Sequence, residues 1–432
     1  MIKKKQYSSY KDSGIDGIGK IPEHWETNKI KNLFEFSKGL NITKKDLTET
    51  GIPVISYGQI HAKFNDGIHI KDELIRHTDK TKAKTNSKVS KGDFIFADTS
   101  EDLDGCGNSI YINKEMLLYG GYHDVILKSK INRDNTYLAY LFQSKKWRSQ
   151  IKSKVSGVKV YSINQSILKE CYIILPNTDE QEQIAKYLDK QTTKIDQTVT
   201  KNKKLITLLK EKRTTLINQT VTKGLNPDAP MKESGIEWIG KIPEHWNLSK
   251  IKHELKFLDY KRIPLSAEER SNLEKKYDYY GASGIIDKVD DYIFEGTYIL
   301  IGEDGANLLY RNLPLAFLAK GKFWVNNHAH ILDVKKGNIT YFMYLLEQVD
   351  YTNYITGSAQ PKLSADNLKN IQIIKPPVEE QKNISEYLDE KIGKINQTIQ
   401  KIEKNIELLE EYKDSLIHHV VTGKIDVRGV EV

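Results

Sequence analysis

The sequence predicts an α+β protein in which two mixed, mostly-β domains are separated by two long helices that form an antiparallel coiled coil, with a pseudo-twofold internal repeat. Two repeated segments carry this prediction. Residues 11–25 return as residues 232–246, at an offset of 221, and residues 176–222 return as residues 376–422, at an offset of 200. The chain therefore holds two copies of one unit, and the variable part of the second copy is shorter by 21 residues, the difference between the offsets.

Five consecutive segments follow from this repeat. A chain of 432 residues is long enough for two or three domains. We place the first mostly-β domain at 1–178, the first long helix at 179–225, a linker at 226–231, the second mostly-β domain at 232–376, and the second long helix with a C-terminal tail at 377–432. The linker holds the sequence NPDAP, whose two prolines and asparagine are typical of a turn between elements.

Short apolar and β-branched runs between turns predict the strands of the two domains. These runs are residues 52–57, 93–97, 172–175, 297–301 and 371–374. Residues 137–147 and 341–348 have the amphipathic spacing of short helices. A glycine loop follows each of these helices, at residues 156–162 and 356–362, and leads into a helical turn.

The long helices are predicted from a heptad pattern. Acidic residues open both helices, where the helix dipole favours negative charge. In the second copy the apolar residues then alternate at spacings of three and four: Ile392, Ile395, Ile399, Ile402, Ile406, Leu409, Leu416 and Val420. Lys413 is the one break in this seam, and the first copy keeps a weaker seam at equivalent positions. Each helix is about 40 residues, on the order of 60 Å long, and its obvious partner is the other helix.

Composition limits the class of protein. No stretch approaches the roughly 20 apolar residues that span a bilayer, and no apolar segment follows the basic N-terminus, so no signal peptide is predicted. The only cysteines are Cys106 and Cys171, which argues against a disulfide framework or a zinc site and favours a reducing cytoplasm. The net charge of +8 permits a polyanionic partner without requiring one.

Catalytic and cofactor motifs are present only in part. The pattern Gly14-x4-Gly19-Lys20, repeated at Gly235, imitates a phosphate loop, but isoleucine follows the lysine where a hydroxyl should bind Mg²⁺. We expect this segment to anchor the folded start of each domain. The histidines form no metal-binding pattern. The acidic loops at 98–104 and 303–304 are interpreted as turns, with a metal site or an acceptor for a cytosine amino group as alternatives.

What remains is a binding protein. The loops of the two domains carry tyrosine, lysine and amide or hydroxyl residues, which are groups that contact phosphates and read base edges. They are also ordinary surface residues, and only their clustering near the glycine loops favours a function. The candidate DNA-binding residues are Tyr57, Gln59, Lys63, Lys159, Tyr161, Ser162, Tyr280, Ser283, Asn327, His328, Gln360 and Lys362. No catalytic residue and no metal ligand is predicted.

Three duplicated motifs carry a family resemblance. They are the opening SGIxxIGKIPEHW, the late glycine loop, and the helix start Pro-x-x-[Asp/Glu]-Glu-Gln. In this order the chain resembles the DNA specificity subunit of type I restriction–modification systems over nearly its whole length. The resemblance implies two target-recognition domains, each reading one half of a bipartite site in double-stranded DNA. It also implies a coiled coil that acts as a spacer. Two domains on such a rigid strut must meet the same face of the duplex, so we expect half-site centres roughly one helical turn, about 34–36 Å, apart.

The resemblance further implies partners and cofactors. Two adenine methyltransferase (modification) subunits dock on the coiled coil, and motor–nuclease (restriction) subunits complete the complex. S-adenosylmethionine, ATP and Mg are expected in those subunits and none in this chain, which is expected to be a non-catalytic subunit. The second glycine loop resembles the commoner family form and the first does not, so different half-sites are expected. A two-domain DNA-binding regulator and a coiled-coil scaffold without restriction partners are the alternatives.

Overall fold

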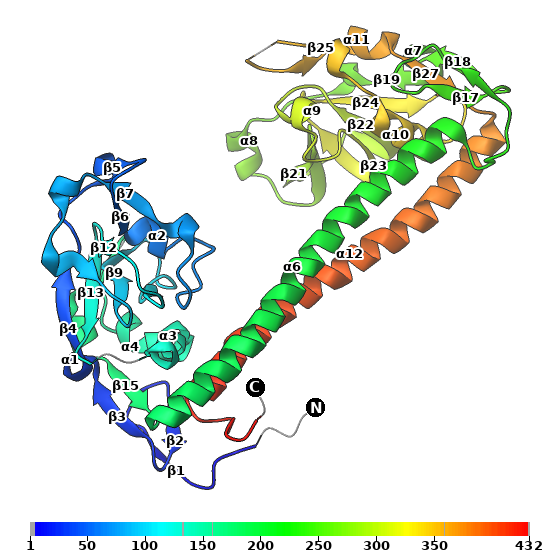
Figure 1. Ribbon diagram of the computed structural model, residues 1–432. Coiled ribbons are helices and arrows are strands. Elements are labelled where there is room, and N and C mark those ends of the chain that lie inside the picture. The colour runs from blue at the N-terminus through cyan, green and yellow to red at the C-terminus, as the bar shows by residue number, and fades with distance from the viewer. Residues whose placement is uncertain (1–4, 132–133, 158, 358, 431–432) are drawn as a thin grey trace. The chain divides into compact units, whose positions relative to one another are not determined.

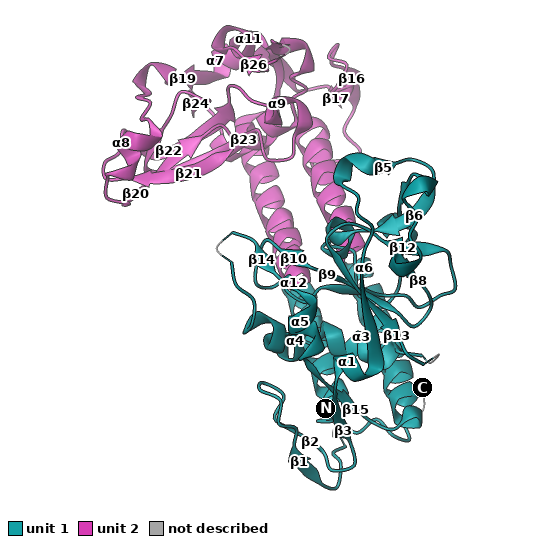
Figure 2. Ribbon diagram, turned by 90° about the vertical axis from the view of Figure 1, so that its left-hand side faces the viewer, with its two compact units in different colours: residues 1–202, 404–432 teal, residues 203–403 magenta. Residues whose placement is uncertain are grey.

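The structure is a computed structural model that describes residues 5–131, 134–157, 159–357 and 359–430. It divides into two compact units (Figure 2). Unit 1 holds residues 1–202 and 404–432, and unit 2 holds residues 203–403. Each unit takes one β-rich domain and half of each long helix, whereas the boundaries drawn on the sequence keep the helices as separate segments.

Unit 1 contains two main sheets. The antiparallel sheet has the order β11–β9–β13–β4 and the second has the order β5–β7–β6–β12–β8, in which β6 and β12 are parallel. The strands of the first are β4 (Phe34–Lys38), β9 (Phe94–Ala97), β11 (Ser109–Tyr111) and β13 (Asp124–Ser129). Those of the second are β5 (Leu47–Thr48), β6 (Ile52–Ile55), β7 (Arg76–Thr78), β8 (Lys88–Val89) and β12 (Leu118–Gly120). All four residues of β9 are buried, because both faces of this central strand are covered.

The single helix predicted at 137–147 is wrong in one respect: two helices occupy this region. They are α3 (Thr136–Gln143) and α4 (Lys145–Lys152). Ser144 between them has φ −66° and ψ 119°, an extended conformation that ends one helix and starts the next. The break lets both helices bury apolar side chains, among them Tyr140 and Trp147, so packing overrides the continuous local pattern.

Unit 2 is built on one six-stranded sheet with the order β19–β24–β22–β23–β20–β21. Its strands are β19 (Leu255–Phe257), β20 (Tyr277–Gly281), β21 (Gly284–Val289), β22 (Phe294–Gly302), β23 (Ala316–Val325) and β24 (Ala329–Val334). All pairs are antiparallel except β20 with β23. Helix α10 (Ile339–Gln348), predicted at 341–348, packs Phe342, Leu345 and Leu346 into the core of this unit.

The repeated opening segment forms a β-hairpin in each unit. In unit 1, β1 (Tyr10–Asp12) pairs with β2 (Lys20–Pro22), and in unit 2, β16 (Met231–Glu233) pairs with β17 (Lys241–Pro243). The glycine-lysine pattern therefore lies in a hairpin turn between two strands and starts no helix, so it makes no phosphate loop. The tryptophan after each hairpin, Trp25 or Trp246, is completely buried, as expected for an anchor.

The two long helices are α6 (Thr178–Lys223) and α12 (Val378–Val421) (Figure 1). Within each unit their halves run antiparallel. In unit 1 Lys413 of α12 meets Asp196 of α6 at 2.7 Å, and in unit 2 Arg213 of α6 donates to Asn396 of α12 at 3.0 Å. The seam predicted from the heptads is buried or half-buried at every position from Ile392 to Val420, which confirms the coiled-coil assignment.

The first and last parts of the chain meet in unit 1. The Asp426 amide donates to the Lys5 carbonyl at 2.8 Å, and the Tyr10 hydroxyl donates to the Gly423 carbonyl at 3.1 Å. The β1–β2 hairpin thus packs at the end of α12, as β16–β17 follows the end of α6. No helix among the described residues is long and apolar enough to cross a membrane.

Candidate functional site

Both units repeat one backbone frame at the carboxyl end of an interior strand of their main sheets. The strand β9 or β22 is followed directly by an acidic residue, Asp98 or Glu303. In unit 1 the Asp98 carbonyl accepts from the Ile163 amide at 2.7 Å, and the Asp98 amide donates to the His123 carbonyl at 2.9 Å. In unit 2 the same two bonds join Glu303 to Leu363 at 2.7 Å and to His328 at 2.8 Å. The frame therefore brings the acidic loop, a histidine turn and the segment after the glycine loop together in each unit.

The predicted glycine loops form the tips of hairpins. In unit 2, β25 (Ile355–Thr356) pairs with β26 (Lys362–Leu363), and a bridge joins Ser156 to Ser162 at the equivalent place in unit 1. A β-carbon on Gly157 would lie 2.0 Å from the Val160 carbonyl oxygen, and one on Gly357 would lie 2.6 Å from the Gln360 carbonyl oxygen. Only glycine permits these tight tips. Val158 and Ser358 lie outside the described residues.

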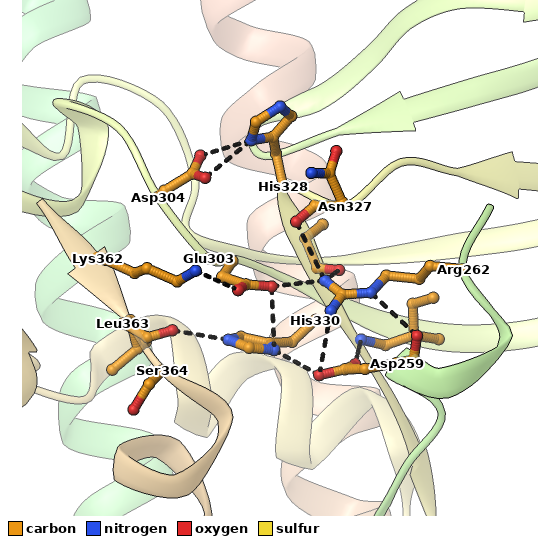
Figure 3. Close-up of polar contacts among 12 residues, drawn as sticks. Asp259, Arg262, Glu303, Asp304, Asn327, His328, His330, Lys362, Leu363 and Ser364 are labelled. Carbon is orange, nitrogen blue, oxygen red and sulfur yellow. Dashed lines mark hydrogen bonds and ion pairs between the residues drawn. The ribbon is translucent and has the colours of Figure 1, made fainter. Parts of the chain in front are cut away.

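A network of charged groups fills the site of unit 2 (Figure 3). Arg262 Nη1 donates to Glu303 Oε2 at 2.5 Å, to the Ala329 carbonyl at 2.9 Å and to the Asn327 carbonyl at 3.3 Å. Lys362 Nζ lies 3.2 Å from the other oxygen of Glu303. Burial opposes ionisation of Glu303, but the hydrogen bond from Arg262 and the nearby positive charges hold its pKa below the ordinary value. Glu303 therefore remains an anion shared by two cations.

His330 anchors the hairpin of β25 and β26 to the core of unit 2. Its side chain is 1% exposed. Its Nε2 donates to the Leu363 carbonyl at 2.8 Å, and its Nδ1 lies 2.6 Å from Asp259 Oδ2. Burial raises the pKa of Asp259, but the hydrogen bond with His330, the hydrogen bond from the Ile331 amide and the nearby positive charge together leave the pKa below the ordinary value. Both ring nitrogens thus face acceptor oxygens.

Unit 1 is hollow at the corresponding place. A cavity of about 660 Å³ opens beside the first hairpin, lined by Tyr57, His61, Asn108, His123, Val160 and the acidic loop. His61 Nε2 donates to the Thr99 carbonyl at 2.9 Å, so its Nδ1 accepts from Asn108 at 3.0 Å. His123 lies 3.1 Å from Asp98. The same backbone frame therefore supports an open pocket in one unit and a charged network in the other.

The site residues predicted in unit 1 fall into two groups. Tyr57 begins α2 (Tyr57–Ile60) and lines the cavity with the first hairpin. Tyr161 and Ser162 form β14, which pairs with β10 (Thr99–Ser100), and Lys159 is exposed on the same hairpin. Gln59 bonds back to the Ser56 amide at 3.2 Å and caps α2. Lys63 is exposed just after that helix.

The predicted residues of unit 2 also divide. Asn327, His328 and Lys362 lie together in the network, and Gln360 is exposed on the same hairpin as Lys362. Ser283 is half-buried in the turn between β20 and β21. Tyr280 is 9% exposed and stacks on Phe317 in an apolar cluster of the sheet. Tyr280 therefore packs within the sheet, and the predicted residues that the structure brings together in this unit are those of the hairpin and of the Asn327–His328 turn.

Sequence reasoning missed three residues of the network: Asp259, Arg262 and His330. Apart from the local bond between Asp259 and Arg262, their hydrogen-bond partners lie 33 to 72 residues away along the chain, so no local pattern marks them. The first acidic loop bends and turns after β10, whereas in the second Asp304 forms an isolated bridge with Lys362 and its carboxylate lies 2.8 Å from His328 Nδ1.

Comparison with known proteins identifies the repeated domain. A family model described as the type I restriction modification DNA specificity domain matches residues 22–207 and again residues 243–408. In Methanocaldococcus jannaschii, the putative type I restriction enzyme MjaX specificity subunit is 26% identical over 95% of this chain and 96% of that protein. The type I restriction enzyme MjaVIII specificity subunit of the same organism is 24% identical over 95% of each chain.

Solved structures agree in fold. A chain from a study of complex assembly and conformational transition of the type I R-M system superposes with a TM-score of 0.70 at 12% identity, over 94% of this chain and 99% of that chain. The HsdS subunit from Thermoanaerobacter tengcongensis gives a TM-score of 0.52 at 13% identity, over 94% of this chain and 98% of that chain.

Proposed function

The chain belongs to the type I restriction–modification DNA specificity family, and from this premise we propose that each β-rich domain reads one half of a bipartite site in double-stranded DNA. The observation that carries the proposal is the repeated frame with different contents. Equivalent backbone bonds hold both hairpins, yet Lys362 of the second stands where the first has Ser162. One frame with two sets of exposed side chains suits the reading of two different sequences.

The surroundings of the hairpins support contact with DNA. Lys159 and Gln360 are exposed at the two tips, and lysine and amide side chains contact phosphates and base edges. We propose the remaining predicted residues of the hairpins and turns as further contacts: Tyr57, Tyr161, Ser162, Asn327, His328 and Lys362.

We propose that the chain is a non-catalytic subunit. Methyl transfer would belong to two adenine modification subunits that bind S-adenosylmethionine, and DNA translocation and cleavage to restriction subunits that use ATP and Mg. The coiled coil would dock the modification subunits and set the spacer between the half-sites. Family membership favours this assembly over a lone regulator or a scaffold.

Methylome sequencing tests the proposal. Cells with the gene should carry a bipartite methylated motif that disappears when the gene is deleted. Replacing residues 232–376 by the same segment of a relative should change one half of that motif only. A motif that persists without the gene, or a replacement that alters both halves, would contradict separate reading by the two domains.

A further inference from the structure

We propose that Arg262 is a positioning residue for DNA reading by the second domain: it neutralises Glu303 from inside the protein and so leaves Lys362 available for a DNA phosphate. The inference rests on the proposed function and names a residue that acts through others. Arg262 lies on the turn after β19, distant in sequence from the hairpin that it serves.

Arg262 is largely buried and held by several hydrogen bonds. Its side chain is 16% exposed, and that of Glu303 is 11% exposed. Besides Glu303, the guanidinium donates to the carbonyls of Asn327 and Ala329, and its Nε donates to the Asp259 carbonyl at 3.1 Å. These bonds tie the Asn327–His328 turn to the acidic loop. The planar guanidinium presents its donors in a fixed fork that serves several acceptors at set directions, a geometry that the ammonium group of lysine does not match.

Glu303 needs a permanent counter-charge. A buried carboxylate without a partner is strongly unfavourable, and beside a DNA phosphate it would also repel the ligand. Arg262 takes one carboxylate oxygen and Lys362 approaches the other at 3.2 Å. His330 Nδ1 is more distant, at 3.8 Å from Glu303, and is already bonded to Asp259. Arg262 is therefore the cation that stays when Lys362 leaves.

Lys362 is placed to change partners. Its side chain is 55% exposed, in contrast to that of Arg262. Because Glu303 retains Arg262, Lys362 can turn towards a phosphate without leaving an unpaired carboxylate behind. The described residues of the first domain form no such arrangement, since serine stands at position 162 and the acidic residue Asp98 pairs with His123. The pairing of Glu303 with both Arg262 and Lys362 is therefore expected to affect the reading of the second half-site alone.

The test uses the complete complex of this chain with its modification subunits and a synthetic duplex that carries the methylated motif of the wild type. In Arg262→Met, Lys362 becomes the only full counter-charge of Glu303. We expect binding to weaken on the order of tenfold and the slope of log K against log salt to fall by about 0.9, the value for one lost phosphate contact. Because the Asn327–His328 turn also loses its bonds to Arg262, methylation should lose selectivity in the second half-site and keep the first.

Arg270→Met is the matched control. Arg270 is also 16% exposed and pairs with Asp287 at 3.0 Å in the same domain, but it lies outside the network. Its loss should lower stability to a similar degree while the salt slope and the motif stay as in the wild type. Equal changes in both variants would mean that Arg262 acts through folding alone, and the inference would be wrong.

The double variant Arg262→Met with Glu303→Gln separates the two possible roles of the arginine. If Arg262 acts by neutralising Glu303, removal of the carboxylate charge should restore the wild-type salt slope and most of the affinity. If Arg262 itself contacts DNA, the double variant should bind no better than Arg262→Met, which would overturn the inference. A wild-type complex that methylates no bipartite motif would instead contradict the proposed function.

Discussion

Lys413 of α12 donates to both carboxylate oxygens of Asp196 of α6, at 2.7 Å each, at the one point where lysine interrupts the apolar seam. The pseudo-symmetric position, 200 residues earlier, holds Arg213, which donates to Asn396. Each half of the coiled coil thus has a polar pair at the equivalent position of its seam. A polar group within a heptad seam can fix the register of the two helices at some loss of stability.

Lys413→Leu should therefore stabilise unit 1. The lysine side chain is 23% exposed and that of Asp196 is 57% exposed, so the ion pair contributes only about 0–1 kcal/mol and Asp196 can be hydrated in its absence. Leucine would make the seam continuous. We expect the apparent melting temperature of unit 1 to rise by about 2–4 °C, the effect of about 1 kcal/mol, in calorimetry. A lower melting temperature would show that the pair matters more than apolar burial.

The glycines that end the two long helices should differ in tolerance. Gly423 has φ +69° and Gly224 has φ +76°, so alanine costs about 1–2 kcal/mol of backbone strain at either. At Gly423 a β-carbon would also lie 2.3 Å from Pro22 Cδ, whereas at Gly224 it would lie 3.1 Å from a ring carbon of Trp246. Gly423→Ala should therefore lower the melting temperature more than Gly224→Ala. Equal effects would contradict the tighter packing at the end of α12.

His418 should make stability depend on pH. Burial, the neighbouring His419 and two lysines lower the pKa of His418 to about 4. In the unfolded chain its pKa is about 6.5, so the unfolded state binds the extra proton and stability falls as the pH drops from about 6.5 to about 4. His418→Gln should flatten this part of the melting temperature–pH profile. An unchanged profile would exclude His418 as its source.

Tyr57 should be needed for the first half-site. It lines the cavity beside the first hairpin, with its ring edge-on to His123 at 5.5 Å between centroids. Tyr57→Ala should relax selectivity in one half of the methylated motif, by about 1–3 kcal/mol if it removes a base contact. Tyr280→Phe is the control, since Tyr280 packs in the sheet and phenylalanine keeps the ring. A changed motif in the control would return Tyr280 to the interface.

Two residues of the second hairpin, Lys362 and Gln360, are expected to make different kinds of DNA contact. Lys362→Ala should reduce the salt slope by about 0.9 while leaving the motif intact, because a phosphate contact carries no sequence information. Gln360→Ala should loosen the choice of base at one position and leave the salt slope unchanged. Filter binding at several salt concentrations and methylome sequencing measure the two effects. Variants that match the wild type in both would remove these residues from the interface.

The elements that repeat or have a regular period could be predicted from the sequence. The seam from Ile392 to Val420 is a local pattern, and the hairpin segment with its tryptophan anchor occurs in two copies, at Trp25 and Trp246. The break at Ser144 could not be predicted, because the apolar spacing continues across it. Trp147 is buried from a separate helix, α4, and no local pattern marks where that helix begins. The alternation of residues along a strand could not show whether the Tyr280 side chain lies on the packed face or on the exposed face of the sheet.

The polar network could not be predicted, for a topological reason. Arg262 meets Glu303, and His330 meets Asp259, only because strands far apart in the sequence pair in one sheet. The sequence pattern located the loops that carry Asn327, His328 and Lys362, whereas the internal groups that hold those loops carry no local signal.

The division of the chain between the units sets the order in which they can fold on the ribosome. Unit 2 is one continuous segment, 203–403, but unit 1 needs residues 404–432 to close over Trp25 and to accept the Tyr137 hydroxyl at Val421. At about 5–20 residues per second, the N-terminal domain waits tens of seconds for these partners while the second half is made. Residues 404–432, which are made after unit 2, thus complete the packing of a domain that is made before it.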